Sequence, residues 1–280
     1  MIETSWPSLG RGSEAISPTA HYTGHVWFRN GLSHPELATS QGRLLFEAVR
    51  PTMALSGVLG GPTLEAYLLG RHRAIDERLK QAIEHRGATQ VIEVGCGLSP
   101  RGWRFTNRYG DRLTYVEADL PEMAARKRGS LERMGSLSER HRVEELDALR
   151  DRGPGSLAQL TATLDRGQPL VIVTEGLLSY FERDQVLDMW NRFAETLSGF
   201  PSGRYVSDLH LSGDARGPHV RAFRAMLSGF VRGPVELHFG DVGEATAALR
   251  KAGFSEAAVH RADTSLVRII DAAVVWAPPV

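Results

Sequence analysis

An acid and two glycines follow one another closely at the end of a short apolar run. In VIEVGCGLSPRG, residues 91–102, Glu93 stands two residues before Gly95 and four before Gly97. Glycine lacks a Cβ, so the chain can turn sharply here and come close to a ligand. Ligands of open α/β sheets bind beyond the carboxyl ends of the strands. The motif therefore predicts a ligand site, the alternative being a strand-to-helix turn that needs glycines only for its shape.

The residues around this turn restrict the kind of ligand. A dinucleotide fingerprint would have a third glycine, and here that position is Pro100, which has no N–H for a pyrophosphate at a helix start. The carboxylate of Glu93 also disfavours a pyrophosphate and favours a zwitterionic ligand. In YVEADLP, residues 115–121, Asp119 lies about 20 residues beyond the turn, where an acid accepts hydrogen bonds from ribose hydroxyls. Glu117 is the competing candidate, and either acid indicates a nucleoside.

Two further charged residues stand in apolar surroundings. Glu175 follows the apolar run in VTEGLLSYF, residues 173–181, and a carboxylate there needs a partner that compensates for lost hydration. Arg71 falls between Leu68 and Ile75 on the apolar stripe of a predicted helix, where a cation either extends to solvent or meets an anion. The ammonium and carboxylate groups of S-adenosylmethionine (SAM) would suit these two residues. An N-cap, a salt bridge or a solvent-directed arginine are the structural alternatives.

The histidines give no indication of a metal. They are scattered, without the H-x-H or H-E-x-x-H spacings that hold metal ions, so no metal is expected. His210 stands near the end of the apolar run 203–211 and is a candidate general base. The alternative is that it is an ordinary polar residue without a catalytic role.

Alternating strand and helix patterns must position these residues. Seven runs are predicted as strands, with the last two forming a hairpin: 89–95, 113–119, 141–146, 169–176, 203–211, 257–262 and 266–277. Helical patterns lie between several of them, and this alternation predicts a doubly wound α/β fold with a mostly parallel sheet. Helices are predicted from Leu64 to a stop at Gly87, over 123–134, through Val186–Leu197, and from an N-cap at Asp241 to Gly253.

Three segments fall outside this alternation. Residues 1–16 are predicted to be a loose tail, and residues 17–62 to hold short helices and loops without a strand. Residues 212–236 are predicted to be an insertion after the fifth strand. We expect residues 1–62 to form a cap and residues 63–280 the main domain. The aromatic residues of the first segment predict that it folds over the carboxyl ends of the strands.

Composition excludes several classes of function. The chain has 280 residues, with 33 Lys and Arg against 33 Asp and Glu, so its formal net charge is zero. This charge does not favour a nucleic-acid partner. Cys96 is the only cysteine, which rules out a disulfide framework and a zinc site built on cysteines. Without a signal pattern or an apolar run of about 18–20 residues, a soluble cytoplasmic protein without a membrane partner is expected.

Four segments together resemble a known family. They are SPTAHYTGHVWFRNGLSHP, EVGCGLSPRGWRF, YVEADLPEMAARKR and TEGLLSYF, and they resemble the leucine carboxyl methyltransferase-like group of class I SAM-dependent methyltransferases. Within it, the chain is similar to the bacterial branch that includes tetracenomycin-type polyketide O-methyltransferases. The resemblance runs from Ser17 to the last strand. It implies a Rossmann-like class I fold with seven strands and a helical N-terminal cap, SAM as methyl donor, and an oxygen acceptor that is often a carboxylate.

The resemblance also implies roles for single residues. Arg71 matches the residue that meets the methionyl carboxylate, Asp119 the ribose acid, and Tyr180 a tyrosine that faces the acceptor. The predicted cofactor-binding residues are Arg71, Glu93, Gly95, Cys96, Gly97, Asp119, Leu120, Asp147, Ala148, Glu175 and Gly176. Among them Asp147 and Ala148 match the loop near the adenine. The chain departs from the family in carrying Ser-Pro in GLSPRG, where relatives usually carry Asp-Thr or Asp-Ser.

These observations predict an O-methyltransferase that acts on a small molecule of secondary metabolism, such as a polyketide or peptide acid. A carboxylate acceptor is favoured because it is already ionised and because no His-Asp or His-Glu base pair stands out; a phenol or other hydroxyl is the alternative. A nicotinamide-dependent oxidoreductase and a non-catalytic SAM-binding protein are the alternatives of other classes. The predicted catalytic residues are Tyr180, Tyr22 and His210. The acceptor's identity and the oligomeric state stay open.

Overall fold

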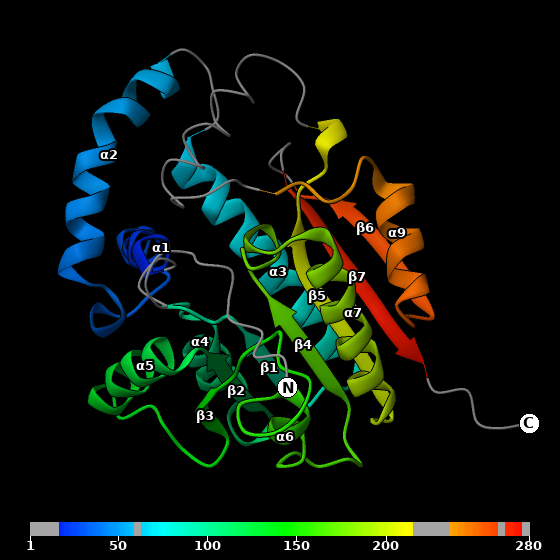
Figure 1. Ribbon diagram of the computed structural model, residues 1–280. Helices are drawn as coiled ribbons and strands as arrows, with labels where there is room; N and C mark the ends of the chain where they lie inside the picture. The colour runs from blue at the N-terminus through cyan, green and yellow to red at the C-terminus, as the bar shows by residue number, and fades with distance from the viewer. Residues whose placement is uncertain (1–16, 59–62, 215–235, 263–266, 276–280) are drawn as a thin grey trace, which may run out of the picture.

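The fold is built on one sheet of seven strands. A computed structural model describes residues 17–58, 63–214, 236–262 and 267–275 (Figure 1). The strand order is β3-β2-β1-β4-β5-β7-β6, with β1 to β5 parallel and β7 antiparallel to both of its neighbours. The strands are β1 Gln90–Val94, β2 Thr114–Asp119, β3 His141–Glu145, β4 Leu170–Thr174, β5 Ser202–Leu209, β6 Glu256–Arg261 and β7 Arg268–Val275. The predicted class I methyltransferase sheet with its terminal hairpin is confirmed.

The register of the central strands aligns the predicted site residues. Val94, the last residue of β1, pairs with Ala118 of β2 and with Thr174 of β4. All residues of β1 and β4 are buried, and apart from Gln90 and Glu93 of β1 and Thr174 of β4 they are apolar. Because the three strands end at one level, the residues that follow them meet at a single edge of the sheet.

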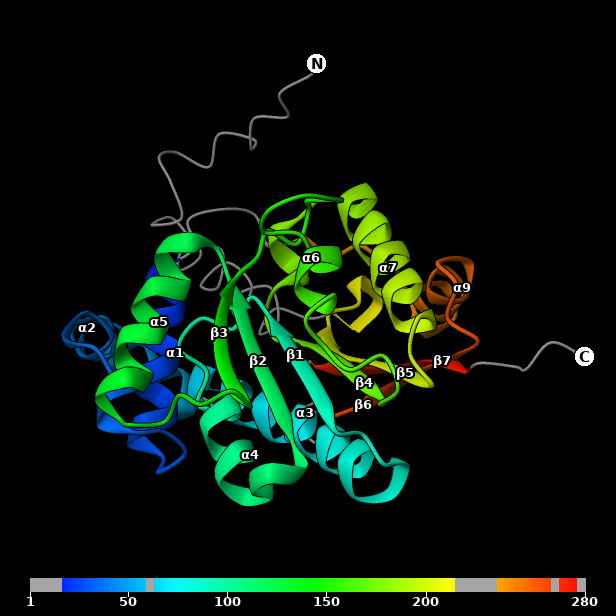
Figure 2. The ribbon, with the colours of Figure 1, turned by 90° about the horizontal axis from the view of Figure 1, so that it is seen from below.

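Helices cover both faces of the sheet, as Figure 2 shows. One face carries α3 Leu64–Arg86, α4 Arg101–Tyr109 and α5 Pro121–Arg133. The other carries α6 Leu157–Thr161, α7 Arg183–Ser198 and α9 Val242–Lys251. Each face has its own apolar core, with Ile75 of α3 in one and Trp190 of α7 in the other. This two-sided covering buries the parallel strands that carry the site.

Two helices begin or end at the capping residues that the sequence predicts. Thr63 caps α3 by accepting a hydrogen bond from the Ala66 N–H, and Gly87 ends the helix in the left-handed conformation at φ 70°. Asp241 caps α9 through the Glu244 N–H, as predicted. The helix α4 was not predicted: it begins directly after Pro100 without a side-chain cap. Its nine residues were too few and too polar to give a recognisable helical pattern.

The segment before residue 62 is more helical than the sequence indicated. It forms α1 Ser17–Arg29, the 3₁₀ turn η2 Pro35–Leu37 and the nineteen-residue helix α2 Ser40–Val58. The prediction of short helices was wrong for α2, which stands at the outer edge of the molecule (Figure 1). Tyr22, Trp27 and Phe46 of the segment are buried, whereas Phe28 is exposed; Tyr22 stacks on Phe46 with ring centroids 5.9 Å apart. Over residues 40–50 of α2 only Gly42 and Phe46 are buried, so the apolar pattern was too sparse to indicate a long helix.

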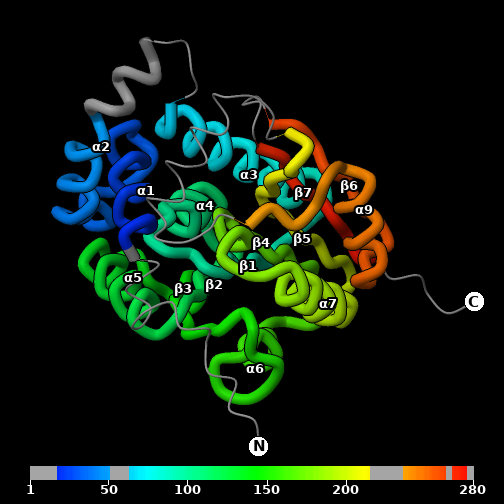
Figure 3. Tube along the Cα trace, turned by 45° about the horizontal axis from the view of Figure 1, so that its top comes forward, coloured from blue at the N-terminus to red at the C-terminus, as the bar shows by residue number. Residues whose placement is uncertain are grey.

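The first helix lies over the glycine turn that follows β1. A Cβ placed on Gly97 would lie 3.3 Å from the Cβ of Ala20, and one placed on Gly24 would lie 3.2 Å from the Cβ of Leu98. Figure 3 shows α1 beside α4. Helix α1 therefore reaches the edge of the sheet where the predicted site residues gather, while the proposed division of the chain at residue 62 stays a prediction.

Parts of two predicted segments lie outside the described residues. These are the tail over 1–16 and residues 215–235 of the predicted insertion. The described start of the insertion is the 3₁₀ turn η5 Ser212–Asp214, where Arg268 of β7 donates to both oxygens of Asp214 at 2.7 Å. Across the described ranges, no helix has the length and apolar character that a membrane crossing requires.

Candidate active site

The glycine turn after β1 brings two loops into close contact. Gly95 and Gly97 have φ values of 69° and 50°, which only glycine adopts readily. A Cβ on Gly95 would lie 2.8 Å from the side chain of Leu177, in the loop after β4. The turn is therefore closed against the β4 loop, and a larger residue at position 95 would force the two apart.

Of the two acids on β2, Asp119 is the one held at the turn. Its carboxylate accepts hydrogen bonds from the N–H groups of Gly97, at 2.7 Å, and Leu120, at 2.8 Å. Burial raises its pKa above the usual range. Glu117 instead lies fully buried beneath the turn, in an ion pair with Lys127 and 2.8 Å from His141 Nε2. The structure thus separates a carboxylate at the edge of the sheet from one in its interior.

A buried cation reaches the ends of β4 and β5 from helix α3. Arg71 Nε lies 3.1 Å from Glu175 Oε1, and Arg71 Nη1 lies 3.5 Å from Asp208 Oδ2. Burial opposes the charge of Arg71, but the two carboxylates outweigh it and raise its pKa. The other oxygen of Asp208 accepts a hydrogen bond from the Gly176 N–H at 2.7 Å. Arg71 was predicted to contact an anion, and in the structure it contacts the carboxylates of Glu175 and Asp208.

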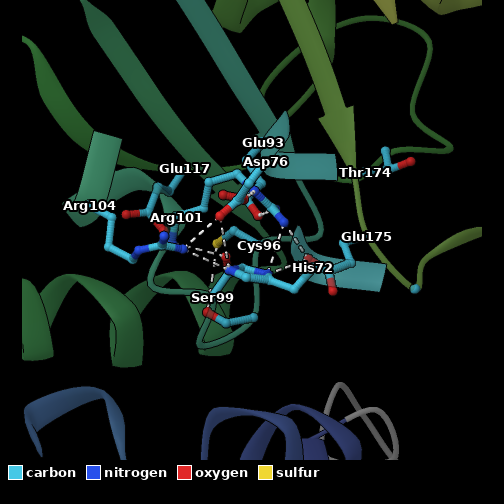
Figure 4. Close-up of polar contacts among 12 residues, drawn as sticks. His72, Asp76, Glu93, Cys96, Ser99, Arg101, Arg104, Glu117, Thr174 and Glu175 are labelled. Atoms are coloured by element: carbon cyan, nitrogen blue, oxygen red, sulfur yellow. Dashed lines mark hydrogen bonds and ion pairs between the residues drawn. The ribbon is translucent and has the colours of Figure 1, made fainter. Parts of the chain in front are cut away.

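A second buried cation, Arg101, escaped the sequence analysis. Its guanidinium contacts carboxylates from three elements, as Figure 4 shows: Asp76 of α3 at 2.7 Å, Glu93 of β1 at 2.5 Å and Glu175 at 2.5 Å. The other oxygen of Glu93 accepts from the Tyr115 hydroxyl at 2.7 Å. Both oxygens of Glu93 therefore have partners within the protein. An arginine placed directly after a glycine turn was the signal that could have revealed this cluster.

His72 completes the surroundings of Glu175. Its side chain has no solvent exposure, and its Nδ1 lies 2.8 Å from Glu175 Oε2. The indole ring of Trp27, from α1, packs against it with ring centroids 4.8 Å apart. Helices α1, α3 and α4 thus all contribute to the polar cluster at the end of β4.

A tyrosine and a histidine meet beside Arg71. The hydroxyl of Tyr67 is hydrogen-bonded to Nε2 of His210, whose Nδ1 lies 3.5 Å from the hydroxyl of Ser179. The guanidinium carbon of Arg71 lies 5.8 Å from the centre of the Tyr67 ring. The sequence predicted His210 as a base but not its partner, which stands 143 positions earlier in the chain.

The two other predicted catalytic residues lie in different places. Tyr180 ends the 3₁₀ turn η4 Leu178–Tyr180, which follows the loop after β4, and burial raises its pKa. Tyr22 packs between α1 and α2, and burial together with Glu65 raises its pKa to about 12. Tyr180 and His210 therefore share the strand ends with Arg71, whereas Tyr22 is part of the core between the first helices.

The remaining predicted cofactor residues also lie at strand ends. Asp147 follows β3 and accepts a hydrogen bond from the Leu149 N–H at 3.0 Å, and the carbonyl of Ala148 accepts one from Arg192 at 3.1 Å. Cys96 is buried in the glycine turn, and burial raises the pKa of its thiol. The predicted residues thus line the carboxyl ends of β1 to β4. Within the described ranges, no three His, Cys, Asp or Glu side chains are grouped to hold a metal ion.

Two sequence comparisons bear on this site. A family model described as leucine carboxyl methyltransferase matches residues 44–194, which is more than half of the chain. A protein of Frankia alni, provisionally named an S-adenosyl-L-methionine-dependent methyltransferase, is 32% identical over 122 residues. These residues make up 44% of this chain and 41% of that relative, so the match spans less than half of its length.

Solved structures share the fold at low sequence identity. A DUF574 family protein from Streptomyces avermitilis has a TM-score of 0.63 at 14% identity, over 92% of this chain and 97% of that one. Human N-acetylserotonin methyltransferase, solved with SAM, has a TM-score of 0.52 at 14% identity, over 96% of this chain and 69% of that one. These likenesses concern the fold alone.

Proposed function

Because the chain belongs to the leucine carboxyl methyltransferase family, we propose that it transfers a methyl group from SAM to an oxygen atom of a small molecule, and that this oxygen belongs to a carboxylate. SAM is the cofactor that the family and the named relative indicate. When bound, SAM supplies an electrophilic methyl group on a sulfonium. A polyketide or peptide acid of secondary metabolism is the acceptor class that we propose.

The chemistry of the side chains at the sheet edge fits SAM. Asp119 offers acceptors for the ribose hydroxyls, Arg71 a cation for the methionyl carboxylate, and Glu175 an anion for the methionyl ammonium. Gly176 keeps this space open, because a Cβ there would lie 3.0 Å from Arg71 Nη1, at a φ of 67° that disfavours other residues. We propose Asp147 and Ala148 for the adenine. Glu93, with both oxygens on protein donors, would support the turn from beneath.

Two protonated tyrosines, Tyr67 and Tyr180, favour a carboxylate as the acceptor. Burial raises the pKa of Tyr67 and that of Tyr180, so both hydroxyls are hydrogen-bond donors at neutral pH. His210 is already hydrogen-bonded to Tyr67, so it is poorly placed to take a proton from an acceptor. Hydroxyl donors suit an oxygen anion that needs no base, and a carboxylate is such an anion at neutral pH.

A hydroxyl acceptor is the second candidate, and the pair of Tyr67 and His210 favours it. In that case His210 would receive the acceptor's proton through the Tyr67 hydroxyl. Family membership weighs against the nicotinamide-dependent alternative. A protein that binds SAM without catalysis is separated from an enzyme by the assay below.

Matched acceptors distinguish these possibilities. The protein is incubated with methyl-labelled SAM and with pairs of aromatic acids and phenols of the same skeleton, between pH 6 and pH 9. We expect labelled products from the acids only and a rate nearly independent of pH. Mild alkali should release the label as methanol, because it hydrolyses a methyl ester. Label on the phenols that resists alkali, with a rate that rises with pH, would support the hydroxyl acceptor. Bound SAM without any labelled product would support the non-catalytic alternative.

A further inference from the structure

Arg101 occupies the centre of the buried polar cluster, and we propose that it is a positioning residue that holds Glu175 in place for the ammonium group of the cofactor. The inference rests on the proposed function, because Glu175 is placed there at the methionyl group. In this proposal Arg101 does not contact the reacting atoms. It acts only through Glu175.

The geometry of Arg101 fixes three carboxylates at once. Its Nε, Nη1 and Nη2 atoms each face a different acid, and its side chain has no solvent exposure (Figure 4). A guanidinium is a planar, rigid fork, so contacts on three of its nitrogens define the position of the whole group. Asp76 and Glu93 belong to regular elements, α3 and β1, and so anchor Arg101 to the scaffold. Glu175, in the loop after β4, is the partner that this anchoring positions.

The two oxygens of Glu175 have different partners. Oε2 accepts a hydrogen bond from Arg101 Nη2 at 2.5 Å and lies 2.8 Å from His72 Nδ1, while Oε1 accepts one from Arg71 Nε at 3.1 Å. Arg71 is also the proposed partner of the methionyl carboxylate, so its hold on Oε1 is the contact that a bound ligand competes for. Arg101, in contrast, has no proposed contact with the ligand. It can therefore keep Oε2 in place while Oε1 changes partner from Arg71 to the ligand's ammonium.

The charge of Glu175 also favours a cationic ligand. When Oε1 leaves Arg71, the partners that remain are Arg101 and His72, both at Oε2. Burying a carboxylate without a counter-charge is costly, so a cation that enters at Glu175 would be stabilised. The ammonium of the methionyl group is such a cation.

The test compares two ligands that differ in this ammonium. S-adenosylhomocysteine has the amino acid group, whereas 5′-methylthioadenosine shares the nucleoside and the thioether but lacks both ammonium and carboxylate. Arg101→Lys keeps the charge but cannot bridge three acids. We expect it to weaken S-adenosylhomocysteine binding by about tenfold or more in calorimetry, as for a lost hydrogen bond between charged groups, and to change methylthioadenosine binding by less than about twofold.

Arg104→Lys is the matched control. Arg104 lies on the same helix and shares the partner Asp76, at 2.6 Å; it also lies 3.3 Å from His72 Nε2, but it makes no direct contact with Glu175. It should leave the affinity for both ligands within about twofold. An Arg101→Lys variant that loses affinity for both ligands equally, or for neither, would show a purely structural role and overturn the proposal.

Two more variants keep the outcome interpretable. If Arg101→Lys fails to fold, Glu93→Gln weakens an anchor of Arg101 without touching Glu175, and it should give a smaller loss that is again selective for S-adenosylhomocysteine. An equal loss for both ligands would count against the proposal. Glu175→Gln tests the premise: if it leaves S-adenosylhomocysteine binding unchanged, the proposed cofactor role of Glu175 is wrong, whatever Arg101 does.

Discussion

Arg71 and Glu175 form a buried ion pair although they stand 104 positions apart, with Arg71 Nε 3.1 Å from Glu175 Oε1. Neither residue finds this partner in its own element, because one comes from α3 and the other follows β4. The pair lies where the methionyl group of SAM is proposed to bind. A ligand with an ammonium and a carboxylate would replace a contact that the protein already makes with itself, and the polar groups of the proposed site would keep partners in both states.

Arg71→Gln should weaken SAM binding by about tenfold or more, because it removes the cation proposed for the methionyl carboxylate. Isothermal calorimetry with S-adenosylhomocysteine measures the loss directly. Arg73→Gln, an exposed position on the same helix, is the control and should leave the affinity unchanged. Equal effects of the two substitutions would remove Arg71 from the site.

Asp119→Ala should likewise weaken SAM binding by about tenfold or more, since a hydrogen bond to a charged group is typically worth about 1.5–3 kcal/mol. Glu117→Gln should affect the affinity less, because Glu117 is turned to Lys127 and His141 in the interior. Competition binding with a fluorescent SAM analogue compares the two. A greater loss of affinity with Glu117→Gln would reverse the assignment of the ribose acid.

Glu117 should matter for stability, and its effect should depend on pH. Burial alone raises its pKa, but Lys127 and His141 outweigh burial and hold the pKa below its ordinary value of 4.5. A carboxylate with a lowered folded-state pKa stabilises the fold above its unfolded pKa and loses this contribution as the pH falls through the folded value. Urea unfolding should thus show a loss of stability below about pH 4.5.

The variant Glu117→Gln tests this reading. It leaves Lys127 without its buried counter-charge and should cost about 3–5 kcal/mol of unfolding free energy at pH 7. It should also flatten the dependence on pH below 4.5. Glu77→Gln, at an exposed ion pair with Lys80, should cost less than about 1 kcal/mol. An acid transition that is the same in wild type and Glu117→Gln would assign it to other groups.

Tyr67→Phe should lower kcat while leaving the affinity for SAM unchanged, because it removes a donor from the acceptor side but not from the cofactor side. We expect a loss of about tenfold or more, by the same reasoning as for other preorganised donors. Steady-state kinetics with an accepted acid measure it. Tyr109→Phe, whose hydroxyl donates to Glu84 at the far end of α4, is the control. A Tyr67→Phe enzyme with wild-type kcat would exclude the hydroxyl from the reaction.

Methyl transfer should survive EDTA, since the proposed acceptor needs no metal-bound oxygen to become nucleophilic. The labelled-SAM assay with and without chelator measures this. Loss of transfer with EDTA and recovery with magnesium would point to a metal near Asp208 and His210, and to a hydroxyl acceptor.

Local patterns alone determined most of the fold. Short β-branched runs, a Gly-x-Gly turn and acids directly after the strands predicted the seven strands, the terminal hairpin and the edge where the residues of the proposed site gather. This worked because a parallel strand buried on both faces is largely apolar, and because strand ends of a parallel sheet share one edge. The register that joins Val94 to Thr174 follows from the same regularity.

Only the tertiary structure decided which charges belong together. Arg101 looked like one arginine among many, and its three acids come from positions 76, 93 and 175. Tyr67 and His210 meet across 143 positions, and Phe46 of α2 is buried against Tyr22 of α1. The physical reason is the same in each case: a buried polar group is stabilised by a partner near it in space, and nothing in its own sequence neighbourhood specifies that partner.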